Sequence, residues 1–443
     1  MNTIAGFRLT PLNRYMLLGL VVFCSLNGCV RVFGSFSSAT IYQKDFIQGY
    51  VLARALREGI NPYLPLPELV PRWLPGQHSF SALPHATPHP IPVGWLCLPF
   101  SLLGYERGAV AWLIFELACL FGIVVLLLRW LGKPPTVGLV VLAAFAALGW
   151  VPVTQDLWYG QLSLFLLFLL LLAWTALREG RPVAGGLLLG VMIAVKFLAW
   201  PIVLFLALRR QWKAVGAAAA TLCVTHLLAI ATLGFAGVRD YYLKIGPMLA
   251  AYYRAHDSNF SAWTIGQRLF VGGGGNFYAP PLLDAPVLAK VFIPLLPVAL
   301  LLLGLRCALK AREFDTSFAL LVIVSVLVSP IAWTHYLVFA ALPLVLLWRR
   351  LSEQGFPAQL TKRALVMSLP LGLTQAIYVM AAMWFVQGTN AAGVPIVPFA
   401  AGILTLAPLV ILVACFGLVW QSEQTAGRAS LALENAVGPE VLA

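Results

Sequence analysis

The feature that most limits how this chain can fold is a series of apolar runs, each about 17 to 25 residues long, the length of a helix that crosses the hydrocarbon core of a bilayer. Polar, proline and glycine residues separate one run from the next. Of the 443 residues, 61% are hydrophobic and 10% are charged, whereas about a quarter of a soluble domain is charged. The sequence therefore predicts an all-α polytopic membrane protein.

The spacing of the apolar runs predicts about eleven to thirteen transmembrane or half-membrane helices. The segments 91–129 and 183–208 are not regular crossings, and Lys196 and Pro201 interrupt the second one. A pair of half-helices explains each segment better, because a membrane tolerates them where protein or a wet cavity covers the free backbone groups. Clear spans are expected near residues 15–34, 288–306, 315–331, 333–348, 363–386 and 396–420.

The distribution of basic residues predicts the orientation of the chain in the membrane. Although the net charge is +13, the Lys and Arg residues form short clusters between apolar runs, which is typical of cytoplasmic loops and does not indicate a nucleic-acid partner. With Arg8 and Arg14 inside, residues 35–90 and 235–287 form two extracytoplasmic loops. We expect a multi-pass protein of the plasma (inner) membrane with an extracytoplasmic active site.

The chain is expected to form a single integral membrane domain over residues 1–420, followed by a mobile cytoplasmic tail over residues 421–443. Its seven cysteines show no ligand spacing, which predicts neither disulfides nor a zinc site. The sequence Leu26-Asn27-Gly28-Cys29 is similar to a lipoprotein processing site, but an uncleaved signal anchor is favoured. Histidines 78, 85 and 89 lack accompanying carboxylates, so we predict no metal and no cofactor.

Asp45 is the strongest functional candidate among the acidic residues, because it follows the first span and opens a short amphipathic helix over residues 44–58. Such a helix should lie in the outer interface plane. Asp is a good helix N-cap, so position alone leaves two interpretations of Asp45 equally open, a cap and a catalytic base.

Other polar residues fall on the same predicted outer face of the membrane. Lys196 lies within an apolar segment, where a charge costs several kcal/mol unless it is paired, which makes it a functional candidate. Tyrosines 241, 242, 252 and 253 of the second outer loop fit an interfacial aromatic belt better than a sugar platform, although both remain open. Gly272 to Gly275 indicates a flexible turn and not a phosphate loop. The remaining candidates are His89, Asp156, Gln161, Asn259, Ser261, Arg268 and His335.

An ordered set of short motifs runs over residues 42–343. The motifs are Asp45-Phe46, Gly59-x-Asn61-Pro62-Tyr63, His89-Pro90, Leu98-Pro99-Phe100, Gly160-Gln161, Ala184-Gly185 through Gly190 to Lys196 and Pro201, Asn259-x-Ser261 up to Arg268, and His335 with Pro343. This set resembles glycosyltransferase family 87, the polyprenyl-phosphate-mannose-dependent mannosyltransferases with a C-type glycosyltransferase fold. The chain departs from the family in having His89-Pro90-Ile91-Pro92 where similar proteins show an aromatic-x-Pro-Pro run.

The resemblance implies transfer of a sugar, mannose in the family, from a polyprenyl-phosphate-linked donor to an acceptor hydroxyl of a glycolipid or glycan. It implies Asp45 as general base of an inverting displacement, since an alcohol is a poor nucleophile at neutral pH. The donor phosphate needs positive charge or hydrogen-bond donors, for which Lys196, Arg268 and His335 are the candidates. Substrate contacts are expected from Tyr63, His89, Asp156, Gln161, Asn259 and Ser261.

Two further interpretations stay open at this point. A solute transporter places ionisable residues near the midplane of paired inverted repeats, and the sequence shows no such repeats. A flippase of lipid-linked sugars also needs a cation for the lipid phosphate but gives Asp45 no acid–base task. The glycosyltransferase interpretation predicts that Asp45, Lys196, Arg268 and His335 surround one amphipathic cavity.

Overall fold

The computed structural model describes residues 11–74, 76, 83–355, 359–364, 366 and 386–437, with side chains to residue 425, together with two short strands near the N-terminus. The described chain is almost entirely helical, which confirms the predicted all-α class. The two strand pairs, β1 (Thr3–Ile4) with β2 (Phe7–Arg8) and β3 (Gly388–Thr389) with β4 (Pro395–Ile396), are antiparallel and only two residues long.

The helices of the first half begin with α1 (Pro11–Gly34), and several start with proline in their first turn, where its missing N–H costs nothing. The others are η1 (Ile41–Gln43), α2 (Phe46–Arg57), α3 (Leu66–Trp73), α4 (Ile91–Ser101), α5 (Tyr105–Trp130), α6 (Val137–Leu148), α7 (Val151–Tyr159), α8 (Ser163–Arg178), α9 (Pro182–Val195) and α10 (Trp200–Leu208).

The helices of the second half begin with α11 (Trp212–Asp240), which is kinked at Gly234, where φ is +79°. They continue with the π-helix η3 (Tyr241–Ile245), α12 (Gly246–Arg254), α13 (Trp263–Phe270), α14 (Pro286–Lys310), α15 (Phe314–Leu327), the 3₁₀ helix η4 (Thr334–Ala340), α16 (Ala341–Glu353), α18 (Phe399–Leu404) and α19 (Ala407–Val437).

Several helices are long and apolar enough to cross a membrane. Within the described residues five meet this test by length and composition, and the pair α6 and α7, bent by 85°, adds a sixth if it forms one span. The other apolar helices, such as α4, α8, α9 and α15, have 10–17 residues and suit partial crossings. The chain is therefore a polytopic membrane protein in which broken and short helices accompany full spans.

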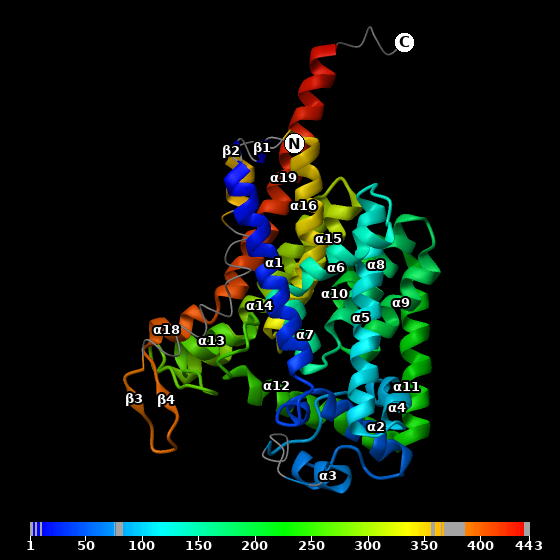
Figure 1. Cartoon of the computed structure of the whole chain (residues 1–443), viewed down its shortest axis with the longest axis vertical. Helices are drawn as coiled ribbons and strands as arrows, with labels where there is room; N and C mark the ends of the chain where they lie inside the picture. Colours follow the sequence, from blue (N-terminus) through cyan, green and yellow to red (C-terminus); the bar gives the residue numbers. More distant parts are fainter. Residues whose placement is uncertain are drawn as a thin grey trace.

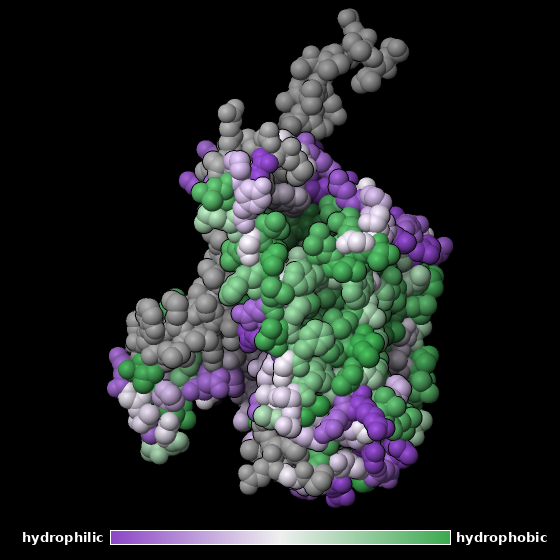
Figure 2. Space-filling model, viewed as in Figure 1, coloured by the Kyte–Doolittle hydropathy of each residue, from purple (hydrophilic) through white to green (hydrophobic). Residues whose placement is uncertain are grey.

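The surface of the molecule matches this assignment. Hydrophobic side chains form a broad belt over the middle of the face in Figure 2, and hydrophilic side chains gather at both ends. Both chain termini lie at one end of the molecule, and α2 and α3 lie at the other (Figure 1). Helix α1 connects the two ends, which is the geometry expected of a first membrane span.

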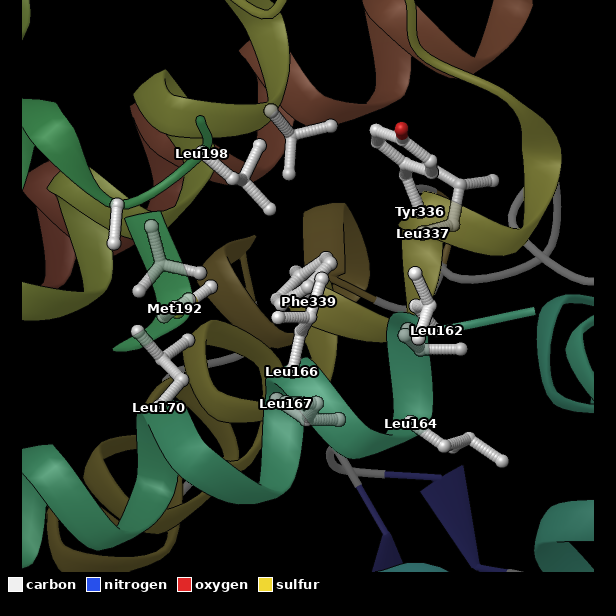
Figure 3. Close-up of a cluster of buried hydrophobic side chains, with 14 of the residues drawn as sticks. Leu162, Leu164, Leu166, Leu167, Leu170, Met192, Leu198, Tyr336, Leu337 and Phe339 are labelled. Carbon is white, nitrogen blue, oxygen red and sulfur yellow. The ribbon is translucent and has the colours of Figure 1, made fainter. Parts of the chain in front are cut away.

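A leucine-rich core holds the short helices together. Leu166, Leu167 and Leu170 of α8 pack with Met192 of α9 and Phe339 of η4, and Figure 3 shows these side chains pointing toward one another. Because lipid tails are as apolar as leucine, these contacts stabilise the fold mainly through close van der Waals packing between the helices. Because η4 is packed on α8 in this way, the residues at its start are held in a fixed position relative to α8.

The element boundaries refine most of the predicted ones, but the half-helix pair expected over 91–129 is wrong, because the short helix α4 is followed by α5, which is long enough for a full span. The expected helix over residues 44–58 begins at Phe46 and ends at Arg57, and the segment 183–208 is a half-helix pair, α9 and α10, broken at Lys196. The span expected over 333–348 starts as a 3₁₀ helix, and that over 396–420 is divided into α18 and α19. Helix α19 continues to Val437, into the segment expected to be a mobile tail. Most of the span predicted over 363–386 lies outside the described residues, as does His78.

Candidate active site

A cavity of about 530 Å³ lies among the start of α2, the end of α7, the break between α9 and α10, and the start of η4. Five of the residues singled out from the sequence line it. They are Asp45, His89, Gln161, Lys196 and His335. Residues far apart in the chain thus converge on one polar chamber within a largely apolar protein.

The carboxylate of Asp45 faces this cavity and does not cap its helix. Asp45 occupies the N-cap position of α2, but its side chain makes no capping hydrogen bond. Instead, Gln161 Nε2 donates to Asp45 Oδ2, and Gln48 Nε2 donates to Oδ1 at 3.4 Å. Burial raises the pKa of Asp45 to about 6, although the Gln161 hydrogen bond and the charge of Lys196 act in the opposite direction. The side chain is therefore positioned as a base that is mostly ionised at neutral pH.

The residue before Asp45 anchors it to the core. Lys44 is 1% exposed, and its Nζ donates to Ser35 Oγ and to the carbonyl oxygen of Trp158, both at 2.6 Å. The ammonium also lies 4.0 Å from the ring centroid of Phe36. Because Trp158 is in α7 and Gln161 follows that helix, Lys44 fixes Asp45 and its amide partner relative to each other.

Lys196 occupies the non-helical break between α9 and α10, with an extended backbone (φ −154°, ψ 122°). Its Nζ lies 4.2 Å from the ring centroid of Tyr336. Within the described part of the chain it forms no ion pair. A partly buried ammonium that meets only an aromatic face is suited to bind an anion from the cavity.

Two cavity side chains carry polar atoms with no hydrogen-bond partner among the described residues. His335 is 4% exposed, and its Nε2 is unpartnered; Oε1 of Gln48, which is 7% exposed, is in the same situation. Buried polar groups are normally hydrogen-bonded, so an orphaned atom in a cavity wall indicates a ligand. His89 is partly buried, and burial and the charge of Lys196 lower its pKa to about 3, which leaves a neutral imidazole in the wall.

Asp156 and Tyr63, two other candidates from the sequence, lie behind the cavity wall. Asp156 accepts hydrogen bonds from the backbone N–H groups of Ser163 (3.1 Å) and Leu164 (2.9 Å), so it caps the start of α8. Gly160, which lies between Asp156 and Ser163, adopts φ +65°. This conformation turns the chain and presents Gln161 to Asp45. The Tyr63 hydroxyl donates to the His89 carbonyl at 3.3 Å, so Tyr63 supports the segment that carries His89.

Asn259 and Ser261 connect the segment between α12 and α13 to the chain after α15. Asn259 Nδ2 donates to the Pro330 carbonyl at 3.2 Å, and its Oδ1 accepts from the Ala332 N–H at 3.0 Å. Ser261 Oγ donates to the same Pro330 carbonyl at 3.2 Å. Neither residue lines the cavity, and both hold the segment that leads into His335.

Arg268 was expected to bind the donor phosphate, but the structure places its guanidinium in a cage of backbone oxygens. Its Nη2 donates to the carbonyls of Asp257 (2.8 Å) and Asn259 (2.7 Å), and its Nη1 donates to the Gly402 carbonyl (3.0 Å) and to Thr405. The side chain is 4% exposed and does not line the cavity. Arg268 therefore joins α13 and the segment before it to α18. Of the three phosphate candidates, Lys196 and His335 line the chamber.

Several residues of the cavity wall could not be predicted from the sequence. Gln48 lies one turn after Asp45 on α2, and its periodicity alone marks it only as polar. Tyr253, His256 and Trp333 also line the chamber, although the sequence offered no means of separating Tyr253 from its neighbour Tyr252. Within the described residues no group of three His, Cys, Asp or Glu side chains could hold a metal ion.

The fold and the site define a class, a multi-pass membrane protein with a carboxylate and a cation in a buried polar chamber. Residues 87–330, more than half of the chain, match the sequence model of Glycosyltransferase family 87, and the chain belongs to this family. This confirms the predicted resemblance and makes the protein a membrane glycosyltransferase.

One relative adds detail to the family assignment. The chain is 25% identical over 334 residues to the polyprenol-phosphate-mannose-dependent alpha-(1-2)-phosphatidylinositol mannoside mannosyltransferase of Mycobacterium tuberculosis (strain ATCC 25618 / H37Rv), a match that covers 71% of this chain and 74% of the relative. No solved structure matches the chain.

Proposed function

We propose that the protein transfers a sugar, most simply mannose, from a polyprenyl-phosphate donor to a hydroxyl group of a glycolipid or glycan acceptor. The observation that carries the proposal is the carboxylate of Asp45, which faces the same chamber as Lys196 and makes no capping bond. Family membership supports the reaction class, and the relative's name supports the donor and the acceptor class.

In the proposed reaction, the acceptor hydroxyl attacks the anomeric carbon of the donor sugar while Asp45 Oδ takes its proton. The bond between that carbon and the phosphate oxygen breaks, and the polyprenyl phosphate leaves with the electron pair. Lys196 and His335 stabilise the negative charge that develops on the phosphate. A single displacement with one base inverts the configuration, so a β-linked donor gives an α-linked product.

The arrangement of the chamber suits a lipid-linked donor. The lipid tail can stay in the bilayer beside the apolar belt while the sugar phosphate enters the polar cavity, so no nucleotide-binding fold is needed. We place the reaction on the extracytoplasmic side of the plasma (inner) membrane, because α1 leads from the basic N-terminal segment to the end of the molecule that carries α2 (Figure 1).

The test is a transfer assay with synthetic polyprenyl-phosphate mannose and purified protein in lipid nanodiscs. Asp45→Asn should lower the transfer rate by about 10²–10⁴-fold, the usual loss when a general base is removed, without changing thermal stability much. Asp240→Asn is the matched control, because Asp240 pairs with Lys244 at 3.0 Å on the surface. Equal sugar incorporation by the Asp45→Asn variant and the wild type would contradict the role of Asp45 as the base. No incorporation by the wild type would contradict the transfer reaction and favour lipid translocation.

A further inference from the structure

One wall of the chamber consists of aromatic rings from two separate segments. Tyr253 at the end of α12, His256 just after it, and Trp333 before η4 all line the cavity. The ring centroid of Trp333 lies 5.5 Å from that of Tyr253 and 5.2 Å from that of His256, both with edge-to-face geometry. The three rings therefore form one contiguous aromatic surface, and all three are partly exposed.

This aromatic surface differs from an interfacial belt. Tyr252, the neighbour of Tyr253, is 49% exposed and does not line the cavity, whereas Tyr253 is held inside by a 2.7 Å hydrogen bond between its hydroxyl and His85 Nε2. Belt residues meet the lipid headgroups, whereas Tyr253 and Trp333 face the chamber that contains Asp45. Of the two interpretations open for the tyrosines of this loop, the structure therefore favours a platform for Tyr253.

The polar residues next to the rings are fixed in place by a buried carboxylate. Asp257, which is 3% exposed, accepts hydrogen bonds from Ser258 Oγ (2.9 Å), Asn276 Nδ2 (3.3 Å) and the Phe277 N–H (3.1 Å). Ser258 and Asn276 both line the cavity beside His256. Hydroxyl and amide groups thus border the aromatic surface in a defined arrangement.

The glycine run between residues 272 and 275 makes this arrangement possible. A Cβ atom at Gly275, where φ is +151°, would lie 3.1 Å from both the His256 ring and the Asp257 carboxyl carbon. The neighbouring Gly274 N–H donates to the Ala255 carbonyl at 2.8 Å, and its carbonyl accepts from the Asp257 N–H at 3.1 Å. Residues 272–275, which the sequence predicted to form a flexible turn, are therefore packed against the ring of His256.

We infer that Tyr253, His256 and Trp333 bind a pyranose ring of the acceptor, so that the acceptor is a glycoside and not a simple lipid alcohol. The C–H face of a pyranose complements the negative face of an aromatic ring, and its hydroxyls need hydrogen-bonding groups at the rim, which Ser258 and Asn276 supply. A plain alkyl alcohol needs only apolar contacts. The inference rests on the proposed function, since one hydroxyl of this sugar must reach Asp45.

The test compares two acceptor probes, octyl α-mannopyranoside and 1-octanol, with synthetic polyprenyl-phosphate mannose as donor. The wild type should use the glycoside and should not use octanol at a comparable rate. Trp333→Leu should raise KM for the glycoside by about tenfold, the effect expected of losing one aromatic anchor, and should leave KM for the donor unchanged. Trp333→Phe should recover part of the loss, because it restores an aromatic face.

The control is Trp212→Leu, since Trp212 is 63% exposed at the start of α11 and does not line the cavity. Octanol accepted as well as the glycoside, or an unchanged glycoside KM in Trp333→Leu, would overturn the inference while leaving the transfer reaction intact. Saturation-transfer NMR of octyl α-mannopyranoside with the Asp45→Asn protein separates the two proposals. A signal that Trp333→Leu abolishes in this background supports the platform even if no transfer is observed, and a signal that persists unchanged contradicts it.

Discussion

Two charged regions of the molecule differ in how their polar atoms are satisfied. At the end of α16, Arg350 is 4% exposed, and its Nη2 lies 2.5 Å from Glu423 Oε2 and 2.6 Å from Glu313 Oε2. Glu423 also accepts from Thr316 Oγ1 at 2.7 Å and from the Arg312 N–H at 2.7 Å. In the chamber, by contrast, Lys196 meets only the ring of Tyr336, and Nε2 of His335 has no partner among the described residues.

We call a charged residue whose interactions are complete within the protein a framework charge, and one that faces the cavity a site charge. The Arg350 cluster joins α15, α16 and α19 toward the end of the molecule that carries the termini (Figure 1), and its interactions are complete without a ligand. The wall of the chamber contains buried polar atoms that form no hydrogen bond within the described residues, and this costs free energy unless a ligand binds them. Arg268 also belongs to the framework, because its Nη1 and Nη2 donate to carbonyl oxygens and it does not line the cavity.

The largest effect is expected for Arg350→Met. Removing this guanidinium leaves the buried carboxylate of Glu423 without its cation, a change that costs about 3–5 kcal/mol. Thermal unfolding in nanodiscs should show a large loss of stability. The control Arg239→Met should be nearly neutral, because Arg239 is exposed and pairs with Asp240 on the surface. A variant of Arg350 that keeps wild-type stability would break the comparison.

Lys196→Met should lower the transfer activity and leave the thermal stability nearly unchanged, whereas Arg350→Met should lower the stability. Removal of one charge-stabilising group lowers the turnover number by about 10²–10³-fold, and within the described residues the ammonium forms no ion pair that its loss would break. Transfer rates and unfolding temperatures measured on the same sample check both halves. Lys244→Met, at an exposed ion pair, is the control. Unfolding caused by Lys196→Met would show that this lysine is structural.

The pH dependence follows from the pKa of Asp45, which burial raises to about 6. A general base must be ionised, so the transfer rate should be constant well above this value and should fall about tenfold per pH unit well below it. Protonation removes the base as the pH falls, and the effect is reversed on raising the pH. A rate–pH profile measured at saturating donor concentration checks the prediction, and a rate that is flat down to pH 4 would contradict it.

The smallest effect is expected for Gln161→Leu. The hydrogen bond from Gln161 favours the ionised form of Asp45, so its loss should move the acidic limb of the rate–pH profile to higher pH while the plateau rate changes less. Thr334→Val is the matched control, since Thr334 also lines the cavity but is not among the groups that shift the pKa of Asp45. An unshifted limb in Gln161→Leu would show that this amide does not tune the base.

The sequence was sufficient to predict the class of the fold and much of the chamber, because membrane burial makes isolated polar residues conspicuous. Lys196, His335 and Asp45 stand out against apolar surroundings, and Lys196 with Pro201 marked the break between α9 and α10. The role of Arg268 could not be predicted, since the carbonyls that surround it come from residues 256–259 and 402, far apart in the chain. Nor could periodicity separate Tyr253, which faces the chamber, from Tyr252, which does not.

The N-cap alternative for Asp45 also needed three-dimensional information. Sequence position made capping and catalysis equally reasonable, and the backbone of α2 does begin at Phe46. The choice between the two roles depends on Gln161, which is 116 positions away in the chain. Its amide contacts the carboxylate and turns it toward the cavity. Because the family match covers residues 87–330, it does not include Asp45, and the geometry of the chamber provides independent support for its role.

The measurement that tests the central claim most directly is a structure of the protein with a polyprenyl-phosphonate analogue of the mannose donor. The proposal predicts that the phosphonate contacts Lys196 Nζ within ion-pair distance and that the anomeric carbon lies between it and the Asp45 carboxylate. A donor bound outside this chamber, or with its phosphonate remote from Lys196 and its sugar out of reach of Asp45, would contradict it.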